Sequence, residues 1–228
     1  AGAIDMATPR VVDQARRLAA LGADAVVATA PFYTRISRHD ELARHFRDIA
    51  AAVELPIVVY EIPVAVVTSV PPGVIAELAA DNVVRAVKNS SGDLSALRQT
   101  VMATADIPGF SVLTGTEQLV DATLLAGGHG AVPGLANVDP RGFVALYAAC
   151  RAGRWEEARR EQERLMLLLD DAVKAPRRGG GMLGVAGFKA ALSMLGVIAS
   201  NRVASPQAAL DADELAVIAA ALERAGLR

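Results

Sequence analysis

The sequence has few of the residues that disulfides, metal clusters and membrane spans require. Cys150 is the only cysteine in 228 residues, which excludes an internal disulfide and any cysteine-based metal cluster. The three histidines, His39, His45 and His129, are far apart and lack the spacing of metal ligands. No apolar run has the length of a membrane span, and no basic segment followed by an apolar one opens the chain. We therefore expect a cytoplasmic protein that uses no metal.

The sequence also lacks an excess of positive charge. It has 23 Lys and Arg against 25 Asp and Glu, and the net charge of −2 offers no electrostatic attraction for nucleic acid. Between residues 151 and 164 arginines alternate with acidic residues, a pattern typical of a solvated helix face with i,i+4 ion pairs. Aromatic residues are scarce at 4%, but hydrophobic residues make up 53%, much of it Ala and Val. This composition indicates a globular chain with one substantial core.

Short apolar strands alternate with amphipathic helices along the chain. We expect strands at 23–29, 56–60, 83–88, 110–114 and 129–132, and a possible strand stub at 1–4. We expect helices at 8–21, 38–53, 71–80, from 93 onward, and at 117–126, 140–151, 154–174, 185–196 and 212–225. Strand–helix units of about 30 residues require parallel strands that are joined by crossover helices.

A (β/α)8 barrel, or TIM barrel, fits these elements better than a doubly wound sheet. No strand is followed by the Gly-rich turn of a dinucleotide-binding fold. Gly179, Gly181 and Gly184 match G-x-G-x-x-G but lie between two helices, which favours a loop. We expect a barrel portion at 1–140, and the last barrel helix with a C-terminal helical region at 141–228. The strands found are too few to close a barrel, so we expect an upstream segment of about two strand–helix units.

Lys88 is the first candidate catalytic residue because it ends a buried strand. Val84 and Ala86 share its face, and barrel folds carry their catalytic residues at the carboxyl ends of strands. Partial burial disfavours the ammonium form and frees the amine to attack a carbonyl. Tyr60 ends the preceding strand, from which its phenol can relay protons. From the strands alone, a lysine that extends to solvent and an ordinary strand aromatic remain the alternatives.

An ordered set of short motifs adds to this interpretation. The motifs are Pro31-Phe32-Tyr33 with His45-Phe46, Tyr60-Glu61-Ile62-Pro63, Val87-Lys88-Asn89-Ser90-Ser91-Gly92-Asp93, Gly115-Thr116-Glu117, Ala126-Gly127-Gly128-His129-Gly130-Ala131, Ala136-Asn137-Val138-Asp139-Pro140, Phe188-Lys189-Ala190-Ala191-Leu192 and Leu195-Gly196. In order and spacing, from residue 1 to about 200, the set resembles the dihydrodipicolinate synthase and N-acetylneuraminate lyase family. The resemblance implies a TIM barrel that forms a Schiff base with pyruvate.

The resemblance also implies roles for individual residues. Lys88 forms the imine with a 2-oxo acid, and this imine replaces an organic cofactor as the electron sink. Tyr60 is the acid/base phenol, and Tyr33 resembles the tyrosine that family tetramers lend to a neighbour's proton relay. The family's Gly-Thr-Thr-Gly-Glu segment, which holds the keto-acid carboxylate, does not occur in the sequence. In the family this segment belongs to the second strand, and the sequence leaves open whether an upstream segment of the intact protein carries it. The resemblance also implies a homotetramer.

Three positions depart from the family pattern, and two of them, Ala65 and Gly134, concern the second substrate. Ala65 stands where dihydrodipicolinate synthases usually carry an arginine for the carboxylate of aspartate semialdehyde, so that aldehyde loses a bidentate partner. Gly134 stands where sialic acid lyases place a hydroxyl group, so a polyhydroxylated sugar acid loses a contact. Glu61 stands where the family more often has asparagine.

We interpret the protein as a lyase or aldolase that makes or breaks a carbon–carbon bond to pyruvate, with an aldehyde as the other substrate. The residues implied in substrate binding are Ser90, Glu117, Val132 and Gly134. The alternatives within the family are dihydrodipicolinate synthase itself and a dehydratase of deoxy sugar acids. The alternatives outside it are a catalytically inactive binding or regulatory relative and a nucleotide-binding doubly wound protein. The sequence leaves open the aldehyde, the direction of the reaction and any regulator.

Overall fold

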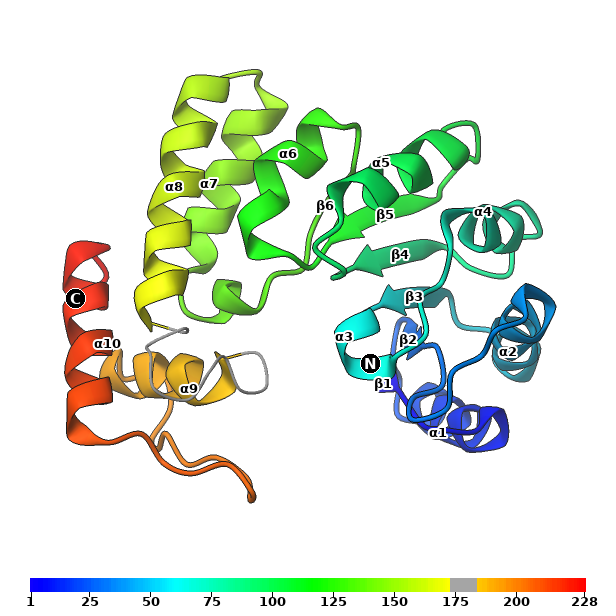
Figure 1. The fold of residues 1–228 in the computed structure, drawn as a ribbon, viewed down its shortest axis with the longest axis horizontal. Coiled ribbons are helices and arrows are strands. Elements are labelled where there is room, and N and C mark those ends of the chain that lie inside the picture. Colours follow the sequence, from blue (N-terminus) through cyan, green and yellow to red (C-terminus); the bar gives the residue numbers. More distant parts are fainter. Residues whose placement is uncertain (173–183) are drawn as a thin grey trace. The chain divides into compact units, whose positions relative to one another are not determined.

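The computed structural model describes residues 1–172 and 184–228 (Figure 1). Gly179 and Gly181 of the glycine-rich match, and the expected last residues of the helix at 154–174, lie outside the described residues. The chain divides into two compact units, Ala1–Val132 and Pro133–Arg228. The domain boundary expected at 140 remains a prediction.

The first unit is built on a parallel sheet whose strands follow one another in sequence order. The strands are β1 (Gly2–Ala3), β2 (Val26–Thr29), β3 (Ile57–Glu61), β4 (Ala86–Asn89), β5 (Ser111–Thr114) and β6 (Gly130–Ala131). Each strand is hydrogen-bonded to the next one along the chain. A doubly wound sheet reverses its strand order at the switch point, whereas a barrel keeps it sequential. The stub expected at 1–4 is β1, which pairs with β2.

The two faces of this sheet differ in burial. Residues on one face are buried beneath helices, and they include Val26, Ala28, Ile57, Val59, Val87 and Val112. Apart from the short α3 (Pro63–Val66), the helices of the first unit are α1 (Thr8–Ala20), α2 (His39–Ala52), α4 (Pro72–Ala80), α5 (Leu94–Ala103) and α6 (Val120–Leu125), which follows the 3-10 turn η1 (Glu117–Leu119) (Figure 1). On the inner face, Val27, Val58, Tyr60 and Lys88 are only half-buried. Side chains on the inner face are therefore less covered than those beneath the helices.

Strands β2 and β4 begin three residues later than the apolar pattern predicts, because helix caps use the preceding residues. The N–H groups of Ala23 and Val83 donate back to carbonyls of the preceding helix, at 3.1 and 2.9 Å. Such bonds satisfy a helix C-terminus and leave these residues outside the strand ladder. β2 therefore begins at Val26 and β4 at Ala86. A short helix after β3, α3 (Pro63–Val66), was not predicted.

The described part of the second unit is helical. It contains the 3-10 turn η2 (Gly134–Asn137) and the helices α7 (Pro140–Arg151), α8 (Trp155–Ala172), α9 (Val185–Met194) and α10 (Ala212–Arg224). The ion pairs predicted for 151–164 are confirmed, since Arg159 bridges Glu156 at 3.0 Å and Glu163 at 2.7 Å. No helix within residues 1–172 and 184–228 is long and apolar enough to cross a membrane.

One ion cluster of the second unit lies partly inside the protein. Arg164 binds Asp139, which is 3% exposed, and Glu161, each with an N–O distance of 2.5 Å. Hydrogen bonds from the guanidinium to Glu161 and Asp139 raise the pKa of Arg164. Asp139 also caps α7, because its carboxylate accepts the N–H of Gly142 at 2.9 Å. The cluster thus joins the start of α7 to the middle of α8.

Candidate active site

Lys88 and Tyr60 lie side by side at the carboxyl ends of β4 and β3. Their Cα atoms are register partners in the parallel ladder, so their side chains leave the sheet on the same face. Lys88 Nζ lies 4.2 Å from the centroid of the Tyr60 ring, a cation–π contact. The proximity expected from adjacent strands is therefore present. An amine and a phenol in contact at this edge of the sheet can act on one carbonyl compound.

Gly115, the residue after β5, leaves the space that the Lys88 side chain occupies. A Cβ at this position would lie 2.6 Å from Lys88 Cε and would overlap Ser90 Oγ. Ser90 is thus brought beside Lys88, and its buried hydroxyl has no hydrogen-bond partner within the described residues. A hydroxyl in this state is available to a bound ligand.

Backbone hydrogen bonds hold these residues in place beyond the ends of the strands. The N–H of Ser90 donates to the carbonyl of Glu61 at 2.7 Å, and the N–H of Gly115 donates to the carbonyl of Asn89 at 2.7 Å. Each bond continues the parallel ladder by one step. The side chains of Ser90 and Lys88 therefore stand on a rigid support rather than on a free loop, as a catalytic arrangement requires.

The neighbouring strand end is fixed by a buried histidine. Thr29 is the register partner of Tyr60, and its carbonyl is 3.1 Å from His45 Nε2. Because a carbonyl only accepts, Nε2 carries the proton, and Nδ1 accepts from the Thr8 hydroxyl at 2.9 Å. Burial lowers the pKa of His45, in agreement with a neutral imidazole. His45 thus joins α1, α2 and the end of β2, and has no free nitrogen for a metal.

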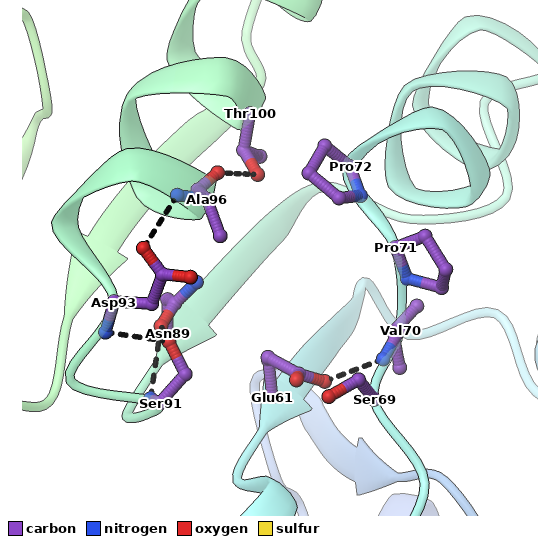
Figure 2. A pocket seen from close by; sticks show the side chains of 10 residues that line it. All are labelled: Glu61, Ser69, Val70, Pro71, Pro72, Asn89, Ser91, Asp93, Ala96 and Thr100. Carbon is purple, nitrogen blue, oxygen red and sulfur yellow. Dashed lines mark hydrogen bonds between the residues drawn. The ribbon is translucent and has the colours of Figure 1, made fainter.

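A polar pocket of about 100 Å³ lies on the other side of β3 and β4, where α4 and α5 begin (Figure 2). Glu61 and Asn89, both 4% exposed, line it together with Ser69, Val70, Pro71, Pro72, Ser91, Asp93, Ala96 and Thr100. The Glu61 carboxylate accepts the N–H of Val70 at 2.7 Å. Burial raises the pKa of this carboxyl, while the bonds from Val70 and the Ser69 hydroxyl oppose the shift. Glu61 therefore ties the end of β3 to the segment before α4.

Tyr33 lies in the segment between β2 and α2 and is 86% exposed, so it does not pack against the Lys88–Tyr60 pair. Its φ of 75° is in the left-handed region, which costs a bulky residue about 1–3 kcal/mol. Such strain persists only where neighbouring contacts enforce it. Two hydrogen bonds act on this segment: the N–H of Thr34 donates to the carbonyl of Phe32 across Tyr33 at 3.0 Å, and the N–H of Ile36 donates to the hydroxyl of Thr68 at 3.1 Å.

The remaining predicted residues are less closely grouped. Glu117 begins η1, two residues after Gly115, and is half-buried. Val132 follows β6, is 46% exposed, and its N–H continues the ladder to Thr114 at 2.7 Å. Gly134 begins η2 and belongs to the second unit. Their roles in binding remain predictions.

Sequence reasoning did not identify the structural roles of Gly115, Glu61 and Thr68. A glycine directly after a strand at its carboxyl end was a usable signal for Gly115, since this edge of a barrel carries the catalytic side chains. No comparable signal marked Glu61 and Thr68. Their partners, Val70 and Ile36, are determined by the way two loops meet in space.

The sequential parallel strands and the lysine at the end of β4 define a (β/α)-barrel protein with an amine at the edge where barrel enzymes carry their catalytic residues. Residues 2–225 match the profile of the Dihydrodipicolinate synthetase family. The chain therefore belongs to the dihydrodipicolinate synthetase family, and the predicted fold class, a TIM barrel with a C-terminal helical region, is confirmed.

Individual relatives agree with this assignment. Over 227 residues the chain is 32% identical to a 4-hydroxy-tetrahydrodipicolinate synthase of Hyphomonas neptunium, covering 100% of this chain and 74% of the relative. It is 36% identical over 220 residues to a DapA-like lyase of Halobacterium salinarum, covering 96% and 68%. A 4-hydroxy-tetrahydrodipicolinate synthase of Sphingopyxis alaskensis is 38% identical over 164 residues, which are 72% of this chain and 55% of that relative.

Solved structures show the same similarity. The chain superposes on the dihydrodipicolinate synthase of Bacteroides thetaiotaomicron with a TM-score of 0.90 and 31% identity, covering 98% of this chain and 74% of the other. The TM-score with the Thermotoga maritima dihydrodipicolinate synthase is 0.91 at 26% identity, covering 100% and 75%.

Proposed function

We propose that the protein is a class I lyase that makes or cleaves a carbon–carbon bond to pyruvate, or a related 2-oxo acid, through an imine on Lys88. The observation that carries the proposal is the 4.2 Å contact between Lys88 Nζ and the Tyr60 ring on adjacent strand ends. Membership in a family of lyases supports it. A catalytically inactive binding protein of the family has no need of an amine and a phenol in contact.

The proposed reaction begins when Lys88 Nζ attacks C2 of the 2-oxo acid. The carbonyl oxygen gains protons and leaves as water, so an iminium remains. The iminium withdraws electrons, C3 loses a proton, and the resulting enamine carbon attacks the carbonyl carbon of an aldehyde. The aldehyde oxygen takes up a proton, and water then hydrolyses the imine and releases the product. Tyr60 relays these protons, and Ser90 offers its unpartnered hydroxyl to the bound substrate.

The aldehyde is the less determined partner. Several relatives are named 4-hydroxy-tetrahydrodipicolinate synthase, which favours the same activity here. Ala65 opposes it, because this exposed position of α3 offers no guanidinium for an aldehyde that carries a carboxylate. We therefore favour an aldehyde without that carboxylate. Product formation from pyruvate with aspartate semialdehyde, compared with a neutral aldehyde of similar length, distinguishes the two.

The predicted assembly is part of the same proposal. Tyr33 is exposed and strained, as expected of a side chain that completes a site in a neighbouring subunit. We infer a cytoplasmic homotetramer, and light scattering of the purified protein tests the number of subunits. A monomer that retains full activity would remove Tyr33 from the mechanism.

The decisive experiment is reduction with borohydride in the presence of pyruvate, followed by peptide mass mapping of the full-length protein. We expect a reduced pyruvyl adduct on Lys88, and none in Lys88→Arg, which keeps the charge but loses the nucleophile. Lys189→Arg is the matched control, since the same change in α9 should leave the adduct intact. An absent adduct in the unmodified protein would favour the binding or regulatory alternative.

A further inference from the structure

Two hydrogen bonds connect the end of β3 to the segment that carries Tyr33. Glu61 directly follows Tyr60, and its carboxylate accepts the N–H of Val70, nine residues further along the chain. This bond holds the two ends of the intervening segment together. Thr68 lies inside this closed segment, is 3% exposed, and its hydroxyl accepts the N–H of Ile36 at 3.1 Å. The side chain of Glu61 and its partner Val70 are visible in Figure 2.

The segment at 31–37 depends on this contact. Within residues 1–172 and 184–228, the bond to Thr68 is the single hydrogen bond that joins residues 31–37 to another segment. Phe32 and Ile36 pack against the core cluster, while Tyr33 between them is exposed with a φ of 75°. The apolar contacts hold the two ends of the turn, but they are not directional. The bond from the Thr34 N–H to the Phe32 carbonyl closes the turn around Tyr33 at 3.0 Å, and the directional Thr68 bond anchors that turn to the segment at 62–70.

We infer that Thr68 and Glu61 are positioning residues that hold Tyr33 in its outward conformation. The hydrogen bond from Val70 to Glu61 holds residues 62–70 against the end of β3. The hydrogen bond from Ile36 to Thr68 then fixes the Tyr33 segment relative to residues 62–70. Tyr60 and Tyr33 are thus oriented by one support, although their side chains are not packed together. The inference rests on the proposed function, because it gives Tyr33 a part in proton relay.

The test is a double-mutant cycle in the full-length protein. Thr68→Val keeps the shape of the side chain and removes the acceptor, and we expect a fall in kcat of about tenfold with little change in KM for pyruvate. Thr68→Ser should restore kcat. In a Tyr33→Phe background, Thr68→Val should cause no further fall, because both changes act on the same phenol.

Two further variants separate positioning from loss of stability. Thr104→Val removes another buried hydroxyl, which bonds only within α5 and its cap, and kcat should not change. Glu61→Leu should behave as Thr68→Val, whereas Glu61→Gln should retain kcat because its amide oxygen can accept the Val70 N–H. A fall in kcat of equal size with and without the Tyr33 hydroxyl would overturn the inference.

A crystal structure of Thr68→Val keeps this test independent of the proposed function. We expect Tyr33 to leave the positive-φ region in the variant. An unchanged Tyr33 backbone together with unchanged kcat would overturn the inference even if Lys88 forms the pyruvyl adduct. A missing adduct in the unmodified protein would overturn the proposed function instead, since the conformation of Tyr33 is observed without any reaction.

Discussion

Each unit of the molecule places a glycine against a charged side chain, but the two glycines serve different ends. In the first unit, Gly115 gives room to Lys88, which is half-buried and has the Tyr60 ring as its neighbour. In the second unit, Gly142 gives room to Arg164, which is bound to the carboxylates of Asp139 and Glu161. The first cation lies against an aromatic ring, whereas the second is held between two carboxylates.

The difference shows that a glycine packed against a cationic side chain can support either reactivity or stability. We propose that Lys88 attacks a carbonyl, and its side chain is held by packing rather than by a carboxylate. An arginine between two carboxylates stays charged and holds two helices together. The comparison therefore predicts that equal substitutions in the two units affect activity and stability separately.

The largest expected effect is that of Gly115→Ala on activity. The added methyl group would displace Lys88 Cε and Ser90 Oγ, and a misplacement of about 1 Å can lower a rate by about 100-fold. The rate of pyruvyl adduct formation measures this effect, and the melting temperature should change little. Gly73→Ala is the matched control, since a Cβ in α4 at this position meets nothing within 4 Å. Normal adduct formation in Gly115→Ala would show that Lys88 does not need the space that Gly115 leaves.

Gly142→Ala should have the opposite profile. Its Cβ would overlap the Arg164 guanidinium and lie 2.5 Å from Asp139 Oδ2, which separates the pair. Because Asp139 is 3% exposed, we expect a loss of about 3 kcal/mol in the free energy of unfolding. Urea denaturation measures this loss, and the Lys88 adduct should still form in the folded fraction. A stable variant without the adduct would show that the cluster serves the reaction instead.

Glu61→Gln tests how the stability of the first unit depends on pH. Burial raises the folded-state pKa of Glu61 above its unfolded value, so the ionised form carries a cost at neutral pH that disappears as pH falls through the folded and unfolded pKa values. We expect the variant to be more stable than the unmodified protein at pH 7. Thermal melts from pH 7 to pH 4 should show this advantage shrinking toward zero. A constant difference across that range would contradict the assignment.

The smallest effect is expected for Arg159→Ala on the exposed face of α8. Its pairs with Glu156 and Glu163 are solvent-exposed, so their loss should leave the free energy of unfolding nearly unchanged. Comparing this variant with Gly142→Ala by urea denaturation separates exposed ion pairs from the partly buried cluster. A large loss in Arg159→Ala would show that the α8 pairs act as a network.

The pairing of Lys88 with Tyr60 could be predicted from the sequence because strand order and period two are local properties. The helices at 8–21, 38–53 and 140–151 were also predicted to within one or two residues, since their patterns and caps are local. The start of β2 was predicted too early, because apolar residues serve equally in a helix cap and in a strand. The bond between Thr68 and Ile36 spans 32 residues, and no sequence pattern marks such a contact between loops.

The sequential strand order also bears on how the first unit folds. Hydrogen-bonded partners lie as close as Leu113 and Gly130, 17 residues apart, and no farther than Val26 and Ile57, 31 residues apart. Every pairing step therefore closes a loop of modest length over one or two helices, and the entropic cost of closure rises only slowly with length. Folding can proceed by adding one strand–helix unit at a time to a growing edge, without a slow search for a distant partner.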